Sequence, residues 1–205
     1  MNDVSVTVIM PIRNEQTYIE RSLGAILAQD YPNEAMEIII ADGLSDDHTL
    51  ECIDSMVAPV RVRVIQNPRR TQAAGLNEAL KVAQGDVIVR VDGHTIIAPN
   101  YVRMCVMLLQ QQKAAVVGGN MTAIAVTPMG QAIAAAVNSG IAVPAAFHFS
   151  RVEQFTDTVY MGAWTRQTLH ARGGFNEQVG VNEDYELSYR IRELGGRDLT
   201  VTAEC

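Results

Sequence analysis

Short apolar segments alternate with amphipathic helical patterns through the first 120 residues, and this alternation constrains the fold more than any other feature. The expected strands are residues 5–10, 37–42, 61–66, 87–91 and 115–120. The helical patterns between them cover residues 15–29, 48–56, 73–85 and 99–112. Four strand–helix alternations in succession are typical of right-handed βαβ units, which place their strands in one parallel sheet. We therefore predict a single α/β domain of Rossmann-like architecture, with a mostly parallel central sheet flanked by helices.

Charge and motifs narrow the classes of function. The chain has 205 residues and a net charge of −7, and its longest basic run is the pair Arg69–Arg70. A nucleic-acid surface requires clustered Lys and Arg, so no nucleic-acid partner is expected. Neither GxGxxG nor GxxxxGKS/T occurs, so the fingerprints of dinucleotide-binding and P-loop proteins are missing. Three cysteines without CxxC spacing indicate reduced thiols.

The pattern changes beyond residue 128. A helix of small residues that includes Ile133 and Ile141 and ends before Pro144 is expected, and a strand is expected over residues 158–162. A further helix opens at residues 182–184, with Leu187, Ile191 and Leu194 on its apolar face. Residues 199–205 resemble a strand without an ending, so we expect the sequence to be truncated at its C-terminus.

We expect neither a signal peptide nor a membrane span within this sequence, on the basis of its composition. No positively charged segment precedes the first strand, and no window of 18 or more residues is continuously apolar. Residues 114–150 nevertheless contain no Asp, Glu, Lys or Arg. This stretch is compatible with a position near lipid, and equally with a core helix of small residues followed by a loop.

The strongest candidate site is Asp92-Gly93-His94, directly after the expected strand at residues 87–91. The carboxyl ends of strands are where open α/β sheets bind their ligands. Asp92 and His94 can both turn toward one divalent ion if the glycine lets the backbone bend. The structural alternative is a turn that caps the following helix.

Other polar residues occupy similar positions. Asp42 ends the second expected strand and Arg13 follows the first, although Asp42 could be a turn former and Arg13 a surface charge. The pair Glu183-Asp184 opens a helix, where carboxylates also favour the helix dipole by about 0.3–1 kcal/mol each. The functional alternative is a general base held by a rigid helix start.

Four motifs in order resemble those of the family 2 glycosyltransferases, which have the GT-A fold. They are Pro11-x-Arg13-Asn14-Glu15; Asp42 with Ser45-Asp46-Asp47-x-Thr49; Gly85-Asp86 before Asp92-x-His94 and Pro99; and Gly173-Gly174-Phe175 before Glu183-Asp184-x-x-Leu187-x-x-Arg190. The likeness covers nearly the whole chain. Residues 91–94, 157–163 and 182–184 are most similar to the ExoA-type members, which build bacterial exopolysaccharides such as succinoglycan.

The resemblance implies a role for each motif. Residues 1–121 would form the nucleotide-binding half and residues 122–205 the acceptor and catalytic-base half. The nucleotide-binding residues would be Pro11, Arg13, Glu15, Asp42, Asp92 and, by a looser match, Asn77. Asp92 and His94 would hold a metal ion that bridges the donor diphosphate. Asp184 would be the catalytic base. The sugar and acceptor would be bordered by Gly162, Ala163, Trp164 and Glu183.

Two departures from the family pattern affect these roles. Gly43 stands where the family commonly has a second Asp, so the contact that reads the base is in doubt. His94 stands in place of the last Asp of a DxD motif; a DxH motif serves in the polypeptide N-acetylgalactosaminyltransferases. Because imidazole suits Mn²⁺ better than Mg²⁺, manganese is the expected cofactor, with magnesium as the alternative.

The family likeness implies an inverting transfer of glucose from UDP-glucose to a hydroxyl of a lipid-linked saccharide. The full-length protein would act at the cytoplasmic face of the inner membrane, while this fragment would be soluble. Alternatives are a GDP- or dTDP-sugar donor, a non-catalytic sugar-nucleotide-binding module, or a structural subunit of a membrane assembly. A nucleotidyltransferase would need a Gly-rich loop after the first strand, and residues 11–15 contain no glycine.

Overall fold

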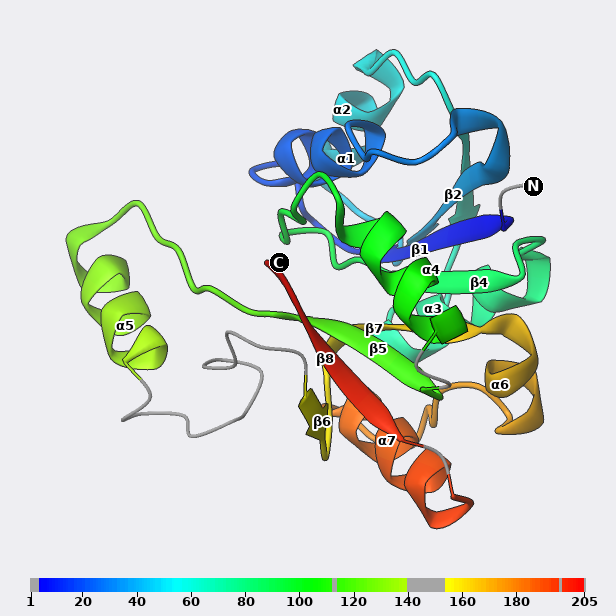
Figure 1. Ribbon diagram of the computed structural model, residues 1–205. Helices are drawn as coiled ribbons and strands as arrows, with labels where there is room; N and C mark the ends of the chain where they lie inside the picture. Colours follow the sequence, from blue (N-terminus) through cyan, green and yellow to red (C-terminus); the bar gives the residue numbers. More distant parts are fainter. Residues whose placement is uncertain (1–3, 112–113, 140–153, 196, 205) are drawn as a thin grey trace.

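The computed structural model describes residues 4–111, 114–139, 154–195 and 197–204. Within these ranges the chain forms one sheet with the strand order β3-β2-β1-β4-β7-β5-β8-β6 (Figure 1). The strands are β1 (Val6–Ile12), β2 (Met36–Asp42), β3 (Arg61–Gln66), β4 (Val87–Arg90), β5 (Val116–Asn120), β6 (Gln154–Thr156), β7 (Tyr160–Thr165) and β8 (Asp198–Glu204). The helices are α1 (Ile19–Leu27), the 3₁₀ helix η1 (Asn33–Ala35), α2 (Thr49–Ser55), α3 (Gln72–Val82), α4 (Tyr101–Gln111), α5 (Pro128–Asn138), α6 (Arg166–Ala171) and α7 (Glu183–Glu193).

Parallel pairing dominates the first half of the sheet. β1 pairs in parallel with β2 and β4, β2 with β3, and β5 with β8. β7 is antiparallel to both of its neighbours, β4 and β5, and β6 is antiparallel to β8. The predicted α/β class with a mostly parallel central sheet is therefore confirmed, although β6 and β7 enter it in the reverse direction.

Helices cover both faces of the sheet because successive residues of a strand point to opposite sides. Val8 of β1 and Ile38 of β2 belong to a core that includes side chains of α1, α2 and α4. Their neighbours Ile9 and Ile39 belong to a second core with α3, α6 and α7. These strands are buried on both faces, which explains their almost unbroken apolar sequences.

Several element boundaries differ from the predictions. The first helix starts at Ile19 rather than at residue 15, because Asn14 adopts a left-handed φ of 58° and a turn follows it. The strand predicted over residues 158–162 runs from Tyr160 to Thr165, and neither β6 nor α6 was predicted. Leu194 lies beyond the end of α7 and is 65% exposed, so it does not belong to the apolar face. The predicted end of the small-residue helix, before Pro144, lies outside the described residues.

The carboxyl ends of β1, β2, β3 and β4 meet at one edge of the sheet. Because β7 is antiparallel to β4, its first residues arrive at the same edge. There the backbone N–H of Asp92 donates to the sulfur of Met161 at 3.2 Å, and the hydroxyls of Thr95 and Tyr160 lie 3.0 Å apart. α5 lies away from the sheet in Figure 1. None of the helices in the described ranges combines the length and hydropathy needed to cross a bilayer.

Candidate active site

A cavity of about 180 Å³ opens at this edge, between the ends of β1 and β4 and the start of α3. Its lining residues are Pro11, Ile12, Arg13, Glu15, Asn67, Arg70, Thr71, Gln72, Asp92 and His94. Five residues that were predicted as site residues from separate motifs therefore line one cavity: Pro11, Arg13, Glu15, Asp92 and His94. They reach the cavity from the ends of two neighbouring parallel strands, as the edge position of their motifs predicted.

The loop after β1 is held in place by the acidic turn after β2. The Asn14 side chain donates to Asp46 at 2.7 Å, and the Asn14 backbone N–H donates to the hydroxyl of Ser45 at 2.9 Å. The backbone N–H of Glu15 donates to the hydroxyl of Thr49 at 2.8 Å. These bonds fix the backbone on either side of Glu15, so its carboxylate enters the cavity from a rigid loop.

Glu15 and His94 form an ion pair across the cavity mouth. Nδ1 of His94 lies 2.9 Å from Oε1 of Glu15. A Cβ at position 93 would lie 2.8 Å from Cγ of Glu15, so only glycine allows this close approach. The hydrogen bond from Glu15 raises the pKa of His94, against the opposing effect of partial burial. A proton on His94 and a metal ion on His94 therefore compete.

Two arginines of the cavity lining carry uncompensated charge. Neither Arg13 nor Arg70 has an ion pair or a side-chain hydrogen bond among the described residues. Arg70 adopts a left-handed φ of 60°, and its backbone N–H donates to the carbonyl of Asn67 at 3.0 Å. The sequence analysis did not identify Asn67 or Arg70 as site residues. Asn67 nevertheless directly follows the end of β3, next to Asp42 of β2. Free guanidinium groups in a small cavity favour an anionic ligand.

Asp42 adopts the turn-forming role that was its structural alternative. It is buried, and its carboxylate accepts hydrogen bonds from the Ser45 hydroxyl at 2.6 Å and from the Ser45 backbone N–H at 3.2 Å. Asp42 does not line the cavity described above. Its predicted contact with the nucleotide stays a prediction, and a ligand would have to extend beyond this cavity to reach it.

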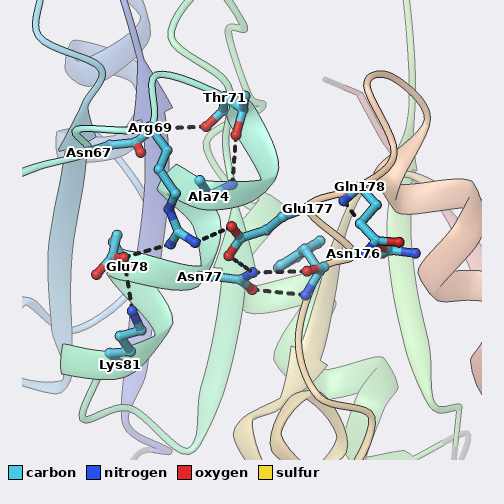
Figure 2. A network of polar contacts seen from close by, with 11 residues as sticks. Asn67, Arg69, Thr71, Ala74, Asn77, Glu78, Lys81, Asn176, Glu177 and Gln178 are labelled. Atoms are coloured by element: carbon cyan, nitrogen blue, oxygen red, sulfur yellow. Dashed lines mark hydrogen bonds and ion pairs between the residues drawn. The ribbon is translucent and has the colours of Figure 1, made fainter.

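Asn77 is not brought to the cavity, contrary to its looser assignment. Its side-chain amide donates to the carbonyl of Phe175 at 2.9 Å and to Glu177 at 2.8 Å, and its oxygen accepts from the Phe175 backbone N–H at 2.9 Å. Arg69 pairs with Glu177 and, at 2.7 Å, with Glu78 (Figure 2). We call Arg69, Asn77, Glu78 and Glu177 the surface bridge. It ties α3 to the loop that precedes α7.

A second ionic group joins β4 to α7, and we call it the buried bridge. Arg90 donates to both carboxylate oxygens of Asp92, from Nε at 2.8 Å and from Nη2 at 3.1 Å. Nη2 also lies 2.8 Å from Oε1 of Glu183. Arg90, Asp92 and Glu183 are only 4%, 6% and 4% exposed. Burial disfavours the charged form of Arg90, but Asp92, Glu183 and Asp184 outweigh it and raise the pKa of Arg90.

This bridge links the predicted metal ligand to the helix that carries the predicted base. Asp184 follows Glu183 in the first turn of α7, and its charge acts on Arg90, which clamps Asp92. Asp184 is partly exposed, so its carboxylate is accessible to a ligand. Glu183, in contrast, is buried and committed to Arg90, which does not agree with its predicted contact to sugar or acceptor. Arg90 itself was missed, because it lies inside a strand that was assigned by its apolar neighbours.

The three β7 residues predicted to border the sugar lie in the core instead. Trp164 is 1% exposed and packs edge-to-face on Phe175 at a centroid distance of 5.7 Å. Ala163 is fully buried in the sheet. Gly162 has a φ of 32°, and a Cβ there would lie 2.3 Å from the Trp164 ring. Gly162 and Trp164 therefore serve packing, which corrects the predicted role.

The side chains at the cavity fit a metal ion that is shared with a ligand rather than a closed protein site. Among the described residues, no group of three or more His, Cys, Asp or Glu side chains could hold a metal. Asp92 and His94 nevertheless line one cavity together with two free arginines. Mg²⁺ and similar ions are often bound by one or two carboxylates and completed by substrate phosphates. The donor set present is compatible with that arrangement.

The fold is that of the GT-A glycosyltransferases. TarS of Staphylococcus aureus, solved in complex with UDP, superposes with a TM-score of 0.75 at 17% identity, covering 98% of this chain and 60% of that chain. Mannosyltransferase PcManGT from Pyrobaculum calidifontis, in complex with GDP-Man and Mn²⁺, superposes with a TM-score of 0.76 at 25% identity, covering 100% and 57%.

The sequence places the chain within one family of that fold. The sequence pattern of the family described as "Glycosyl transferase family 2" matches residues 7–143, so the chain belongs to that family. Succinoglycan biosynthesis protein ExoA of Rhizobium meliloti is 28% identical over 96% of this chain and 61% of the relative. Dolichyl N-acetyl-alpha-D-glucosaminyl phosphate 3-beta-D-2,3-diacetamido-2,3-dideoxy-beta-D-glucuronosyltransferase of Methanococcus voltae is 25% identical over 93% of this chain and 62% of the relative. The chain thus spans about three fifths of the length of these relatives.

Proposed function

We propose that this chain is the catalytic domain of an inverting, metal-dependent glycosyltransferase that moves glucose from UDP-glucose to a hydroxyl of a lipid-linked saccharide. The process it serves is bacterial exopolysaccharide synthesis, as the name of the ExoA relative suggests. The observation that carries the proposal is the buried bridge. In it, one guanidinium binds both Asp92, which lines a cavity with two arginines that make no ion pair among the described residues, and Glu183, which directly precedes Asp184 in α7.

The residues divide the chemistry between the leaving group and the acceptor. Loss of a sugar from its nucleotide leaves a diphosphate, and Arg13 and Arg70 are placed to meet that charge without any proton transfer. A metal ion held by Asp92 and His94 would neutralise further charge on the same diphosphate. An acceptor hydroxyl has a pKa far above neutrality, so a positioned carboxylate must take its proton as it attacks. Asp184 has that role.

A single base and an attack opposite the leaving group imply inversion at the sugar carbon. An α-linked donor then gives a β-linked product. The acceptor hydroxyl approaches from the α7 side, while the nucleotide occupies the cavity between β1 and α3. The sugar would therefore pass from a nucleotide on one side of the buried bridge to an acceptor on the other side.

A different nucleotide donor is the second candidate. The PcManGT neighbour was solved with GDP-Man and Mn²⁺, and it is the more similar of the two solved structures above in both identity and TM-score. Asp42, which would approach the nucleotide base, already accepts a hydrogen bond from Ser45 and is followed by Gly43. Nothing at this position selects uracil, so a GDP-sugar donor competes with UDP-glucose.

The first experiment is donor hydrolysis on a panel of UDP-, GDP- and dTDP-sugars with Mn²⁺, with Mg²⁺ and with EDTA. We expect turnover of one UDP-sugar that EDTA abolishes. Turnover of a GDP-sugar alone would establish the second candidate. Calorimetry with UDP and Mn²⁺ completes the test: binding without hydrolysis of any donor would identify a non-catalytic module, and no binding would indicate a structural subunit.

Asp184→Asn tests the base. General-base assistance is worth about 10²–10⁴-fold, so transfer should fall by that factor while UDP binding persists. Asp157→Asn is the matched control, because it makes the same chemical change at an exposed acidic residue outside the first turn of α7. Near-normal turnover of Asp184→Asn would rule out the assignment.

We further propose that the full-length protein acts at the cytoplasmic face of the inner membrane. Support comes from α5, where Met129 and Ile133 are exposed and no charged residue occurs. Co-sedimentation with vesicles of bacterial lipids tests whether this fragment has membrane affinity. Binding that Met129→Ser and Ile133→Ser remove would support the proposal, and equal recovery in the supernatant with and without vesicles would count against a role for α5.

A further inference from the structure

Arg90 is the least expected polar residue of the fold. It is the last residue of β4, in a strand otherwise made of apolar residues, and it is 4% exposed. Its guanidinium holds Asp92 through two hydrogen bonds and Glu183 through a third contact at 2.8 Å. Nη1 is buried without a hydrogen-bond partner among the described residues. One side chain therefore connects two residues that lie more than 90 positions apart in the sequence.

Stability alone is a poor explanation for such a group. Three charged side chains are buried at a cost in desolvation that their mutual attraction barely offsets, and apolar residues of the same volume often stabilise a core at least as well. The group is also unbalanced, since one guanidinium faces two carboxylates, with Asp184 adjacent. Buried ionic groups of this kind are retained in some proteins because they specify a position.

The buried bridge joins a residue on the nucleotide side of the proposed reaction to a residue on the acceptor side. Asp92 lines the nucleotide cavity, and Glu183 is the first residue of the helix that carries Asp184. The start of α7 has no side-chain cap, because Asn182 adopts a left-handed conformation and makes no capping hydrogen bond. Glu183 ties this helix start to the edge of the sheet through its ion pair with Arg90.

The backbone of the Asp92 loop is held independently of Arg90. The Ser22 hydroxyl of α1 donates to the carbonyls of Asp92 at 3.0 Å and Thr95 at 2.6 Å. The Asp92 backbone N–H bonds Met161. Loss of Arg90 would therefore release the Asp92 carboxylate and the α7 start, while the loop itself keeps its support.

We infer that Arg90 is a positioning residue that fixes the Asp92 carboxylate and, through Glu183, the Asp184 carboxylate relative to one another, so that both act on one bound donor. This inference rests on the proposed function. It assigns to Arg90 and Glu183 no contact with substrate. Their effect on rate arises because a misplacement of about 1 Å can cost roughly 10²-fold in rate.

The test uses Arg90→Lys and Glu183→Gln, assayed on the best donor with Mn²⁺. Arg90→Lys keeps the charge but loses the fork that binds both oxygens of Asp92. We expect kcat to fall by about 10- to 100-fold and the donor KM to rise, because both carboxylates are released. Glu183→Gln leaves the Arg90–Asp92 pair intact, so kcat should fall by roughly 10-fold with donor KM within about 3-fold of wild type.

Non-additivity separates positioning from mere structural support. If Glu183 acts through Asp184, adding Glu183→Gln to Asp184→Asn should lower kcat by less than about 2-fold, since residues that act as a unit are not additive. Arg69→Lys is the matched control, because it changes an arginine that joins the same parts of the chain away from the cavity. Its kcat and KM should remain within about 2-fold of wild type.

Three results would decide against the inference. Arg90→Lys with wild-type kcat and only a lower melting temperature would make Arg90 structural. A full effect of Glu183→Gln in the Asp184→Asn background would mean that Glu183 does not act through Asp184. A wild-type chain that turns over no donor would overturn the proposed function and this inference together, whereas the first two results leave the proposed function standing.

Discussion

The buried bridge and the surface bridge connect the same two parts of the chain in opposite surroundings. Both join the parallel β1–β4 half to the segment around residues 175–184, and in both an arginine pairs with two carboxylates. In the surface bridge the Arg69 side chain is 49% exposed, whereas in the buried bridge that of Arg90 is 5% exposed. Similar chemistry should therefore have different consequences, because water replaces lost partners in one bridge and not in the other.

The largest expected loss of stability is that of the Arg90→Met variant. Removing the guanidinium leaves the Asp92 and Glu183 carboxylates buried without their shared partner, so we expect the free energy of unfolding to fall by about 3–5 kcal/mol. Urea unfolding followed by circular dichroism measures this loss. Arg69→Met is the matched control. A loss below about 1 kcal/mol for Arg90→Met, the range of an exposed pair, would mean that the two bridges do not differ in kind.

Asn77→Ala should have an intermediate effect. Asn77 satisfies the backbone N–H and C=O of Phe175, and its loss leaves these part-buried groups without partners at a cost of about 1–3 kcal/mol. The same urea titration applies. Asn176→Ala in the adjacent loop removes only an exposed hydrogen bond to Gln178 and should change stability by less than about 0.5 kcal/mol. Equal effects of the two variants would refute the distinction.

Arg69→Ala should cost about 0–1 kcal/mol, because both of its ion pairs are solvated. Salt provides the sharper measurement. The Debye length falls from about 10 Å at 0.1 M to about 3 Å at 1 M, so the difference from wild type should shrink toward zero at high salt. The effect of Arg90→Met should persist in the same titration. A salt-independent loss for Arg69→Ala would show that its bridge is effectively buried.

The smallest effect concerns pH at Glu78. The hydrogen bond from Lys81, with the charges of Lys81 and Arg69, holds the pKa of Glu78 below its ordinary value of 4.5. A depressed pKa stabilises the fold above the unfolded-state pKa, and this contribution is lost as pH falls through the folded-state value. The difference between wild type and Glu78→Gln, about 0.3–0.5 kcal/mol at pH 7, should therefore begin to shrink near pH 4.5 and vanish once the pH is below the lowered pKa of Glu78. A difference that grows on acidification would reverse the assigned sign.

Local sequence predicted the first half of the molecule well for a physical reason. β3 runs from Arg61 to Gln66 as expected, and β1, β2 and β4 differ by two residues or fewer at either end. These strands are buried on both faces, so their apolar runs carry the information directly. The cavity lining followed from the same logic, since residues after parallel strands must meet at one edge.

Long-range contacts determined what the sequence did not reveal. The role of Arg90 depends on Glu183, and no pattern near position 90 indicates that partner. Trp164 was assigned to the site by the family resemblance, but antiparallel insertion of β7 buries it in the core against Phe175. Asn77 was misplaced for the same reason: its partners at residues 175–177 come from the other half of the chain.

The insertion of β7 between β4 and β5 has a consequence during synthesis. When β4 leaves the ribosome, one of its edges has β1 as partner, but the other must wait for Tyr160–Thr165, about 70 residues later. At roughly 5–20 residues per second, that apolar edge is exposed for on the order of 4 to 14 seconds. Unpaired strand edges are templates for aggregation, so a chaperone that shields nascent chains should matter most in this interval.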